Sequence, residues 1–175
     1  TAVIFTGPTI SVADAQGELR SEIDLLCLPP AAQGDVYRAA LERPAAIGII
    51  DGYFDRVPSV WHKEILWAMS QGTHVCGAAS MGALRAAELE AFGMVGIGVV
   101  FEAYRDGILE DDDEVAVAHA SAEHGFRAVS DAMVNIRATV AKAKVEGVIG
   151  EACAQRLLDA AKNLFYPQRT IPDAL

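Results

Sequence analysis

Short apolar runs alternate with helical patterns along the first half of the chain. Four runs are nearly continuous in apolar residues, which is typical of strands covered on both faces. They span residues 2–6, 24–28, 46–50 and 73–77. The segments between and after them favour helices, over residues 34–42, 58–70 and 81–92. Strands and helices in alternation predict an α/β fold, with an open, mostly parallel, Rossmann-like sheet and helices on both of its faces.

The second half of the chain has a different pattern. Residues 96–104 fit a strand or a buried segment, and an acidic cluster at residues 111–114 precedes a further predicted strand at residues 115–119. The spacing of apolar residues predicts helices over residues 130–145 and 150–163, and loose chain after Pro167. We therefore predict a single domain over residues 1–175. Its parallel α/β part is residues 1–93, and residues 94–175 hold the acidic turn, the further strand and the C-terminal helices.

Composition narrows the classes of function. Of the 175 residues, 52% are hydrophobic and 22% are charged, which favours a chain with a large buried core. The net charge of −10 argues against a nucleic-acid partner, because phosphates need a basic surface. No apolar run approaches the roughly 20 residues of a membrane span, and the opening residues fit a core strand better than a signal peptide. Three cysteines without metal-ligand spacing predict a reduced, cytoplasmic setting.

The ends of the four predicted strands carry small or turn-forming residues. They are Gly7-Pro8, Pro29-Pro30, Asp51-Gly52 and Ala79-Ser80-Met81-Gly82. Any one pair fits ordinary turn chemistry. Open parallel sheets bind ligands outside the carboxyl ends of their strands, so the four together indicate a shared cleft.

Ser80 is the sharpest candidate for chemistry, because it lies between an apolar strand and a helix. Its surroundings resemble a nucleophile elbow, with a small residue two positions before it and Gly82 two positions after it, although Ala78 replaces the usual first glycine. The amides of Met81 and Gly82 would begin the helix and face an anion held there. Two alternatives stay open: Ser80 caps the helix, or the turn binds an anion without chemistry.

A serine nucleophile needs a base. His62 starts the helix after Asp51-Gly52, and His119 follows the acidic cluster, so either can serve. Asp51 or Glu64 would orient the base. Arg85 can hold an anionic substrate, or can form an ordinary helical pair with Glu88.

Two other groups of residues have plainer interpretations. The acidic residues 111–114 fit a solvated turn better than a cation site, because the spacing of a calcium loop is missing. We expect no metal and no cofactor. Cys27 and Cys76 lie in predicted strands and are expected to be inert thiols, unless one of them reaches the cleft and carries sulfur.

An ordered set of segments resembles the TfuA-like family over nearly the whole chain, from Val3 to about Arg169. The segments include Phe5-Thr6-Gly7-Pro8, Gly34-Asp35, Ile49-Ile50-Asp51-Gly52, residues 60–66, residues 79–89, residues 112–116 with His119, residues 133–139 and Phe165-Tyr166-Pro167. Each segment alone is weak, and the ordered set is specific. No departure from the family pattern is visible in the central block.

The resemblance implies a role beside YcaO-type enzymes, which activate a backbone amide with ATP so that sulfur replaces its oxygen. The TfuA-like partner would supply that sulfur by hydrolysing a thiocarboxylated, ThiS-like sulfur-carrier protein, and the precursor peptide would be a further partner. In this role Ser80 is the nucleophile, His62 the preferred base and His119 the reserve. Gly7, Pro8, Asp35, Gly52, Met81, Gly82 and Arg85 would line the substrate and oxyanion site.

Two other functions remain open at this stage. The chain can be a non-catalytic adaptor that binds the YcaO-type enzyme or the carrier, with Ser80 only capping a helix. A site for a small anion or nucleotide ranks lower, because the chain has no complete phosphate-binding glycine motif.

Overall fold

The computed structural model describes residues 1–18, 23–54 and 56–174. The chain forms two compact units, Thr1–Glu110 and Asp111–Leu175. The first unit therefore extends past residue 93, where the sequence placed the change of pattern. The single TfuA-like core domain stays a prediction.

The first unit is built on a five-stranded sheet whose pairings are all parallel, which confirms the predicted α/β class. Its strands are β1 (Ala2–Phe5), β2 (Leu25–Leu28), β3 (Ala46–Ile49), β4 (His74–Ala78) and β5 (Val95–Ile97), in the spatial order β2-β1-β3-β4-β5. The four predicted strands are β1 to β4. The fifth covers only the start of the segment at residues 96–104, which was expected to be a strand or a buried segment; most of that segment is helical instead.

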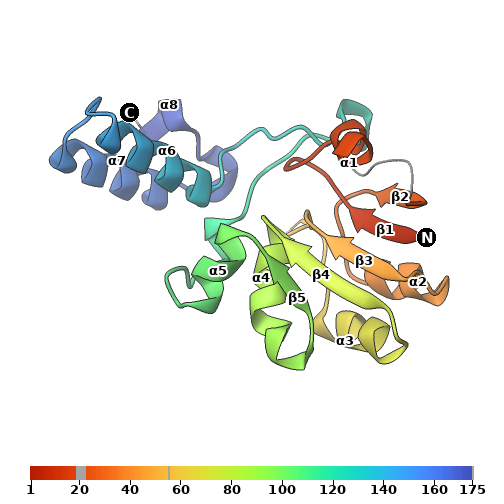
Figure 1. Cartoon of the computed structure of the whole chain (residues 1–175). Coiled ribbons are helices and arrows are strands. Elements are labelled where there is room, and N and C mark those ends of the chain that lie inside the picture. The colour runs from red at the N-terminus through yellow and green to blue at the C-terminus, as the bar shows by residue number, and fades with distance from the viewer. Residues whose placement is uncertain (19–22, 55, 175) are drawn as a thin grey trace. The chain divides into compact units, whose positions relative to one another are not determined.

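Helices connect the strands and cover the sheet (Figure 1). They are α1 (Val12–Glu18), α2 (Asp35–Leu41), α3 (His62–Ser70), α4 (Met81–Leu89, extended by the 3-10 turn η1, Glu90–Phe92) and α5 (Val99–Arg105). The chain moves from β1 to β2 in one direction across the sheet and from β2 to β3 in the other. Right-handed crossovers therefore place α1 and α2 on opposite faces.

The core of the first unit lies between the sheet and the helices α2, α3 and α4. Alternate strand residues that face these helices are at most 4% exposed: Val3, Phe5, Ile47, Ile49 and Val75. Neighbouring positions on the opposite face, such as Ile4 and Cys76, are half-buried. The period of two along each strand thus places one set of side chains in the main core.

The second unit consists mainly of helices. It contains the 3-10 turns η2 (Asp112–Glu114), η3 (Ala122–His124) and η4 (Tyr166–Gln168), and the helices α6 (Met133–Val145), α7 (Glu151–Asn163) and α8 (Ile171–Ala174). Its apolar core joins α6 and α7 through Met133, Ile136, Val140, Ala154 and Ala161. The predicted helices at residues 130–145 and 150–163 are confirmed.

Two expectations for this unit are wrong. Residues 115–119 are not a strand: Ala118 and Ala120 bond to Val129 and Arg127 in an irregular loop with one bridge, His119 to Ala128. The chain after Pro167 is not loose, because α8 forms there and Arg169 is 1% exposed. Within the described ranges, no helix combines the length and the apolar character that crossing a membrane requires.

Candidate functional site

The strand order places a topological switch point between β1 and β3. The chain leaves β1 toward one edge of the sheet and leaves β3 toward the other, so the loops after these strands diverge and expose the carboxyl edge between them. Asp51 lies in the loop after β3 and is 1% exposed. Its carboxylate accepts hydrogen bonds from Thr9 in the loop after β1, from Oγ1 at 2.6 Å and from the amide at 3.2 Å.

The loops at this edge converge closely. Ala31, after β2, donates its amide to the Asp51 carbonyl, and the loop of Gly7 and Pro8 follows β1 beside it. A Cβ on Gly52 would lie 2.7 Å from the Met81 Cγ, so only glycine lets the loop after β3 meet the start of α4. All four predicted strand-end sequences therefore meet at this edge, with Asp51 buried among them.

Ser80 occupies the tight turn between β4 and α4 that the sequence predicted. Ala79 has a left-handed φ of 58°, which is strained for a residue with a Cβ. Ser80 is the N-cap residue of α4 and is 8% exposed, but its hydroxyl makes no capping hydrogen bond. The structure thus gives no support to capping as the reason for a serine here.

The start of α4 is pressed against β3. The Gly82 amide donates to the Ile50 carbonyl at 3.1 Å, and a Cβ on Gly82 would lie 1.8 Å from the Ile49 oxygen. The Ala83 amide bonds to the Ser80 carbonyl at 3.2 Å. The Gly82 amide is therefore committed to the fold, and Met81 is left as the first-turn amide for an anion among the described residues.

Glu64 does not orient a histidine. Its carboxylate, 7% exposed, accepts the backbone amides of Gly34 at 3.0 Å, Tyr37 at 3.1 Å and Trp61 at 2.8 Å. These amides begin α2 and α3, where helices lack internal acceptors. Glu64 fastens the two helix starts together, a role that the sequence did not indicate.

His62 has a different carboxylate partner from those predicted. Its Nε2 lies 2.7 Å from Glu88 Oε2, so the pair joins the first residue of α3 to α4. The same Glu88 oxygen accepts a hydrogen bond from Arg85 at 2.7 Å. The sequence indicates Glu88 only as a helical neighbour of Arg85, because spacing along α4 cannot show that α3 approaches it.

Arg85 is committed to the protein. Its Nε donates to the Val60 carbonyl at 3.0 Å, and its other nitrogens bond to Glu88 and, at 3.4 Å, to Ser59. The residue is 8% exposed. Arg85 is therefore placed to tie α4 to the loop before α3 rather than to hold a substrate charge.

His119 belongs to the second unit. Its Nδ1 lies 2.9 Å from the Ala120 carbonyl, and its ring meets Phe126 edge-on at 5.7 Å between centroids. A carbonyl oxygen only accepts, so we assign the proton of the neutral ring to Nδ1.

Asp35 lies apart from the turn of Ser80. It accepts the Ala32 amide at 2.8 Å and pairs with Arg38 at 2.5 Å. It borders a hollow of about 360 Å³ at the carboxyl ends of β1 and β2, lined by Phe5, Leu28, Pro29, Asp35, Arg38 and Ala39. Burial, followed by the charge of Asp35, raises the pKa of nearby Tyr53.

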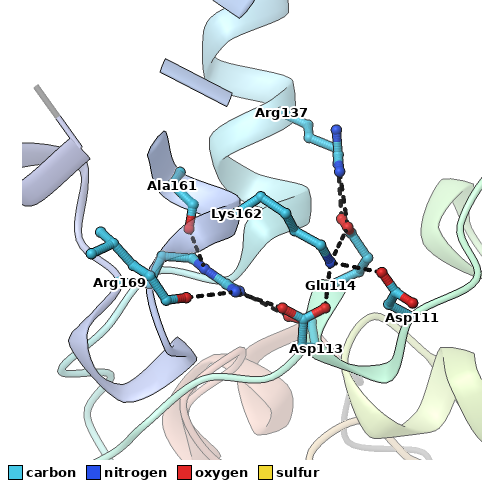
Figure 2. Close-up of polar contacts among 8 residues, drawn as sticks. Asp111, Asp113, Glu114, Arg137, Ala161, Lys162 and Arg169 are labelled. Carbon is cyan, nitrogen blue, oxygen red and sulfur yellow. Dashed lines mark hydrogen bonds and ion pairs between the residues drawn. The ribbon is translucent and has the colours of Figure 1, made fainter. Parts of the chain in front are cut away.

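The acidic cluster of the second unit is not a solvated turn. Figure 2 shows Asp111, Asp113 and Glu114 facing three cations, Arg137, Lys162 and Arg169. Arg137 binds Glu114 through two nitrogens, at 2.8 and 2.9 Å. Lys162 contacts all three carboxylates. We call these six residues the ionic cluster.

The carboxylates of the ionic cluster could approach a metal ion together. Their charges are already balanced by protein cations, so the geometry fits a structural network better than a cation site. Burial acts to raise the pKa of Glu114, but hydrogen bonds from Arg137 and Lys162 outweigh it and hold that pKa below its usual value. The pKa of Asp113 is lowered in the same way, through Lys162 and Arg169.

Cys27 and Cys76 lie in β2 and β4 and are half-buried. Burial raises the pKa of both thiols, which reduces the thiolate available for sulfur chemistry. Neither thiol has the activated environment that a sulfur-carrying cysteine needs.

Comparison with known proteins adds one match. A family model described as TfuA-like protein matches residues 51–170. The matched segment begins at buried Asp51 and includes Ser80, α3, α4 and the ionic cluster. No curated protein matches the chain.

Proposed function

The chain belongs to the TfuA-like family, which is associated with YcaO-type thioamidation, and from this premise we propose that it delivers sulfur for that reaction. The substrate is a ThiS-like sulfur-carrier protein whose C-terminal carboxylate has become a thiocarboxylate. The protein hydrolyses this group and releases sulfide close to the YcaO-type enzyme.

The observation that carries the proposal is the turn at Ser80. A strained, left-handed Ala79 presents Ser80 at the start of α4, and the hydroxyl is not used as a helix cap. Ser80 is only 8% exposed, and such limited access suits a slender glycine tail better than a bulky substrate.

The reaction proceeds by acyl transfer. The Ser80 oxygen attacks the carbonyl carbon of the thiocarboxylate while a histidine takes its proton. The carbon–sulfur bond then breaks, and the histidine returns the proton to the departing sulfur. Water attacks the resulting ester, so that thiocarboxylate and water become carboxylate and hydrogen sulfide. The amides of Met81 and the Gly7 loop are the proposed donors to the tetrahedral oxyanion.

Two histidines are candidates for the base. In His62 the Glu88 carboxylate holds Nε2, and in His119 the Ala120 carbonyl holds Nδ1. The Glu88 carboxylate is placed to orient the His62 ring, as a carboxylate orients the base of a catalytic triad. The buried Asp51, in the loop after β3, is proposed to position the site.

The environment of the β1 loop favours this function over nucleotide binding. The loop amide of Thr9 is already bound by Asp51, and Asp14 lies in the first turn of α1. A phosphate at the β1 loop would meet the Asp51 carboxylate and would find the Thr9 amide already bonded.

We expect wild-type protein to release sulfide from the thiocarboxylated carrier and Ser80→Ala to release it at least about 1,000-fold more slowly. Sulfide is measured over time with the protein alone. Ser70→Ala is the matched control, because Ser70 is an exposed serine that bonds only to nearby groups in α3 and its end. Replacing the true base, in His62→Gln or His119→Gln, is expected to lower the rate about 100-fold or more.

Equal rates for wild type and Ser80→Ala would reject Ser80 as the nucleophile. Sulfide release that requires the YcaO-type enzyme, together with unchanged thioamidation by Ser80→Ala, would support the adaptor function instead.

A further inference from the structure

Both tryptophans of the chain lie near one surface at the seam between α2 and α3. Trp61 is the N-cap residue of α3 and is 54% exposed, and Tyr37 of α2 is 43% exposed. The Tyr37 ring lies 4.6 Å from the ring of half-buried Trp67, between centroids. We call Tyr37, Trp61 and Trp67 the aromatic patch.

The patch is held rigidly from below. The two oxygens of the buried Glu64 carboxylate accept the Trp61 amide at 2.8 Å and the Tyr37 amide at 3.1 Å. One side chain thereby fixes the backbones of both exposed aromatics side by side. Large aromatic side chains on a prearranged backbone are typical of the residues that dominate binding at protein interfaces, since they bury much area at little entropic cost.

The patch is connected to the turn of Ser80. Arg85 lies five residues after Ser80 in α4, about 7.5 Å along the helix, and its Nε binds the carbonyl of Val60, the neighbour of Trp61. Trp61 therefore lies within about 20 Å of Ser80, given the length of an arginine side chain. About six extended residues span that distance.

The distance between the aromatic patch and Ser80 suits a particular kind of partner. A protein whose C-terminal end must reach Ser80 through a flexible tail has its folded body within one tail length of Ser80. We propose that the aromatic patch is the docking surface for the body of the thiocarboxylated carrier protein. The inference rests on the proposed function, because that function supplies the tail and its destination.

Substrate dependence tests the docking surface. For Trp61→Ala we expect the KM for the thiocarboxylated carrier to rise at least about tenfold, with kcat within about twofold of wild type. A short peptide with the same tail and thiocarboxylate should be hydrolysed equally by both proteins, because it has no body to dock. Tyr37→Ala should behave alike and serves as the second variant.

The matched control is Phe92→Ala, which removes an aromatic that is 66% exposed but lies in η1 outside the patch. It should leave the KM for the carrier unchanged. An unchanged KM in Trp61→Ala, or an equal loss with carrier and tail peptide, would overturn the proposal.

Binding measured without turnover separates this inference from the proposed function. Because both tryptophans belong to the patch, a tryptophan-free carrier in its carboxylate form should shift the protein's intrinsic emission to the blue and saturate. Trp61→Ala should weaken that binding at least about tenfold, with Trp67 as the remaining reporter. If sulfide is never released but this binding is observed, hydrolysis fails and the docking surface stands. If the carrier leaves the emission unchanged, the docking surface fails whatever the activity.

Discussion

Neighbouring residues at the start of α4 have separate tasks. Ala79 accepts a left-handed backbone so that the chain can turn from strand to helix. Ser80 presents its hydroxyl at that turn, and Gly82 allows the helix to touch β3. The position of the candidate nucleophile thus depends on a contact made two residues later.

That contact leads to a test of stability. Gly82→Ala places a methyl group against the Ile49 carbonyl, and the backbone there cannot move without breaking the Gly82–Ile50 hydrogen bond. We expect the free energy of unfolding, measured by urea denaturation, to fall by about 3 kcal/mol or more. Gly17→Ala is the control, because no other atom lies within 4 Å of a Cβ there. It should be neutral or stabilising by up to about 1 kcal/mol, and equal losses in both variants would contradict the argument.

At the residue scale, the sequence predicted the tight turn at Ser80 but not the partners of the side chains around it. The small residues around Ser80 indicated a tight turn, because that requirement is local. The partners of Glu64, Arg85 and His62 come from other elements, so spacing along the chain assigned them wrongly or incompletely. Local backbone constraints are written in short motifs, whereas long-range hydrogen bonds depend on how helices approach one another.

At the scale of elements, one carboxylate controls how α2 and α3 begin. Glu64 bonds to amides of both helices and supports the exposed aromatics above them. A glutamine has one acceptor and one donor, so Glu64→Gln would turn an NH₂ group toward a backbone amide. We expect the free energy of unfolding to fall by about 1–3 kcal/mol, as measured by thermal or urea denaturation.

The matched change Glu123→Gln affects an exposed residue in η3 and should leave stability within about 0.5 kcal/mol of wild type. A Glu64→Gln protein as stable as wild type would show that water or rearranged loops can replace these bonds.

Helices and strands were predicted best where the pattern of apolar residues was strongest. The runs that became β1 to β4 are apolar because both faces of a central parallel sheet are covered. Residues 115–119 have a similar composition, but the Ser130 hydroxyl accepts the Ala118 amide, and Val129 and Arg127 bond to the neighbouring backbone. These residues are apolar because several of them are buried or half-buried, but no neighbouring strand in the described part of the chain pairs with them, so they form an irregular loop. The short β5 is weaker in pattern because Val95 and Ile97 are more than half exposed.

At the scale of the whole molecule, part of the excess negative charge is paired with cationic side chains. The ionic cluster joins residues 111–114 to α6, α7 and Arg169, and it lies in the same unit as the core of Met133 and Ile136. Sequence composition showed the net charge of −10 but could not show that this acidic segment has cationic partners up to 56 residues away.

The cluster predicts how stability depends on pH. The folded-state pKa values of Asp113 and Glu114 are lowered, so both groups contribute stability above their unfolded values of about 4. That contribution is lost as the pH falls through the lowered folded values. We expect the helical signal of the protein to become less resistant to urea from about pH 5 down to pH 3.

Glu114→Gln isolates this effect. It leaves Arg137 and Lys162 without their shared carboxylate, so the free energy of unfolding at pH 7 should fall by about 2–3 kcal/mol. Its dependence on pH between about 5 and 3 should also become shallower. Glu146→Gln, which removes an exposed carboxylate 3.8 Å from Lys142, should change neither quantity appreciably. A parallel pH profile in Glu114→Gln and wild type would exclude Glu114 as a source of acid sensitivity.

The burial of Arg169 also has a consequence for biosynthesis. Its guanidinium donates to the backbone carbonyl and the side chain of Asp113, a residue of the acidic segment that opens the second unit. A ribosome must therefore translate α6, α7 and η4 before that carboxylate can meet its last cation, and a chain still lacking Arg169 emerges with part of its negative charge uncompensated. The sheet of the first unit has no such requirement, so the nascent protein acquires its β-strand half early and completes its helical half only when the final segment has left the exit tunnel.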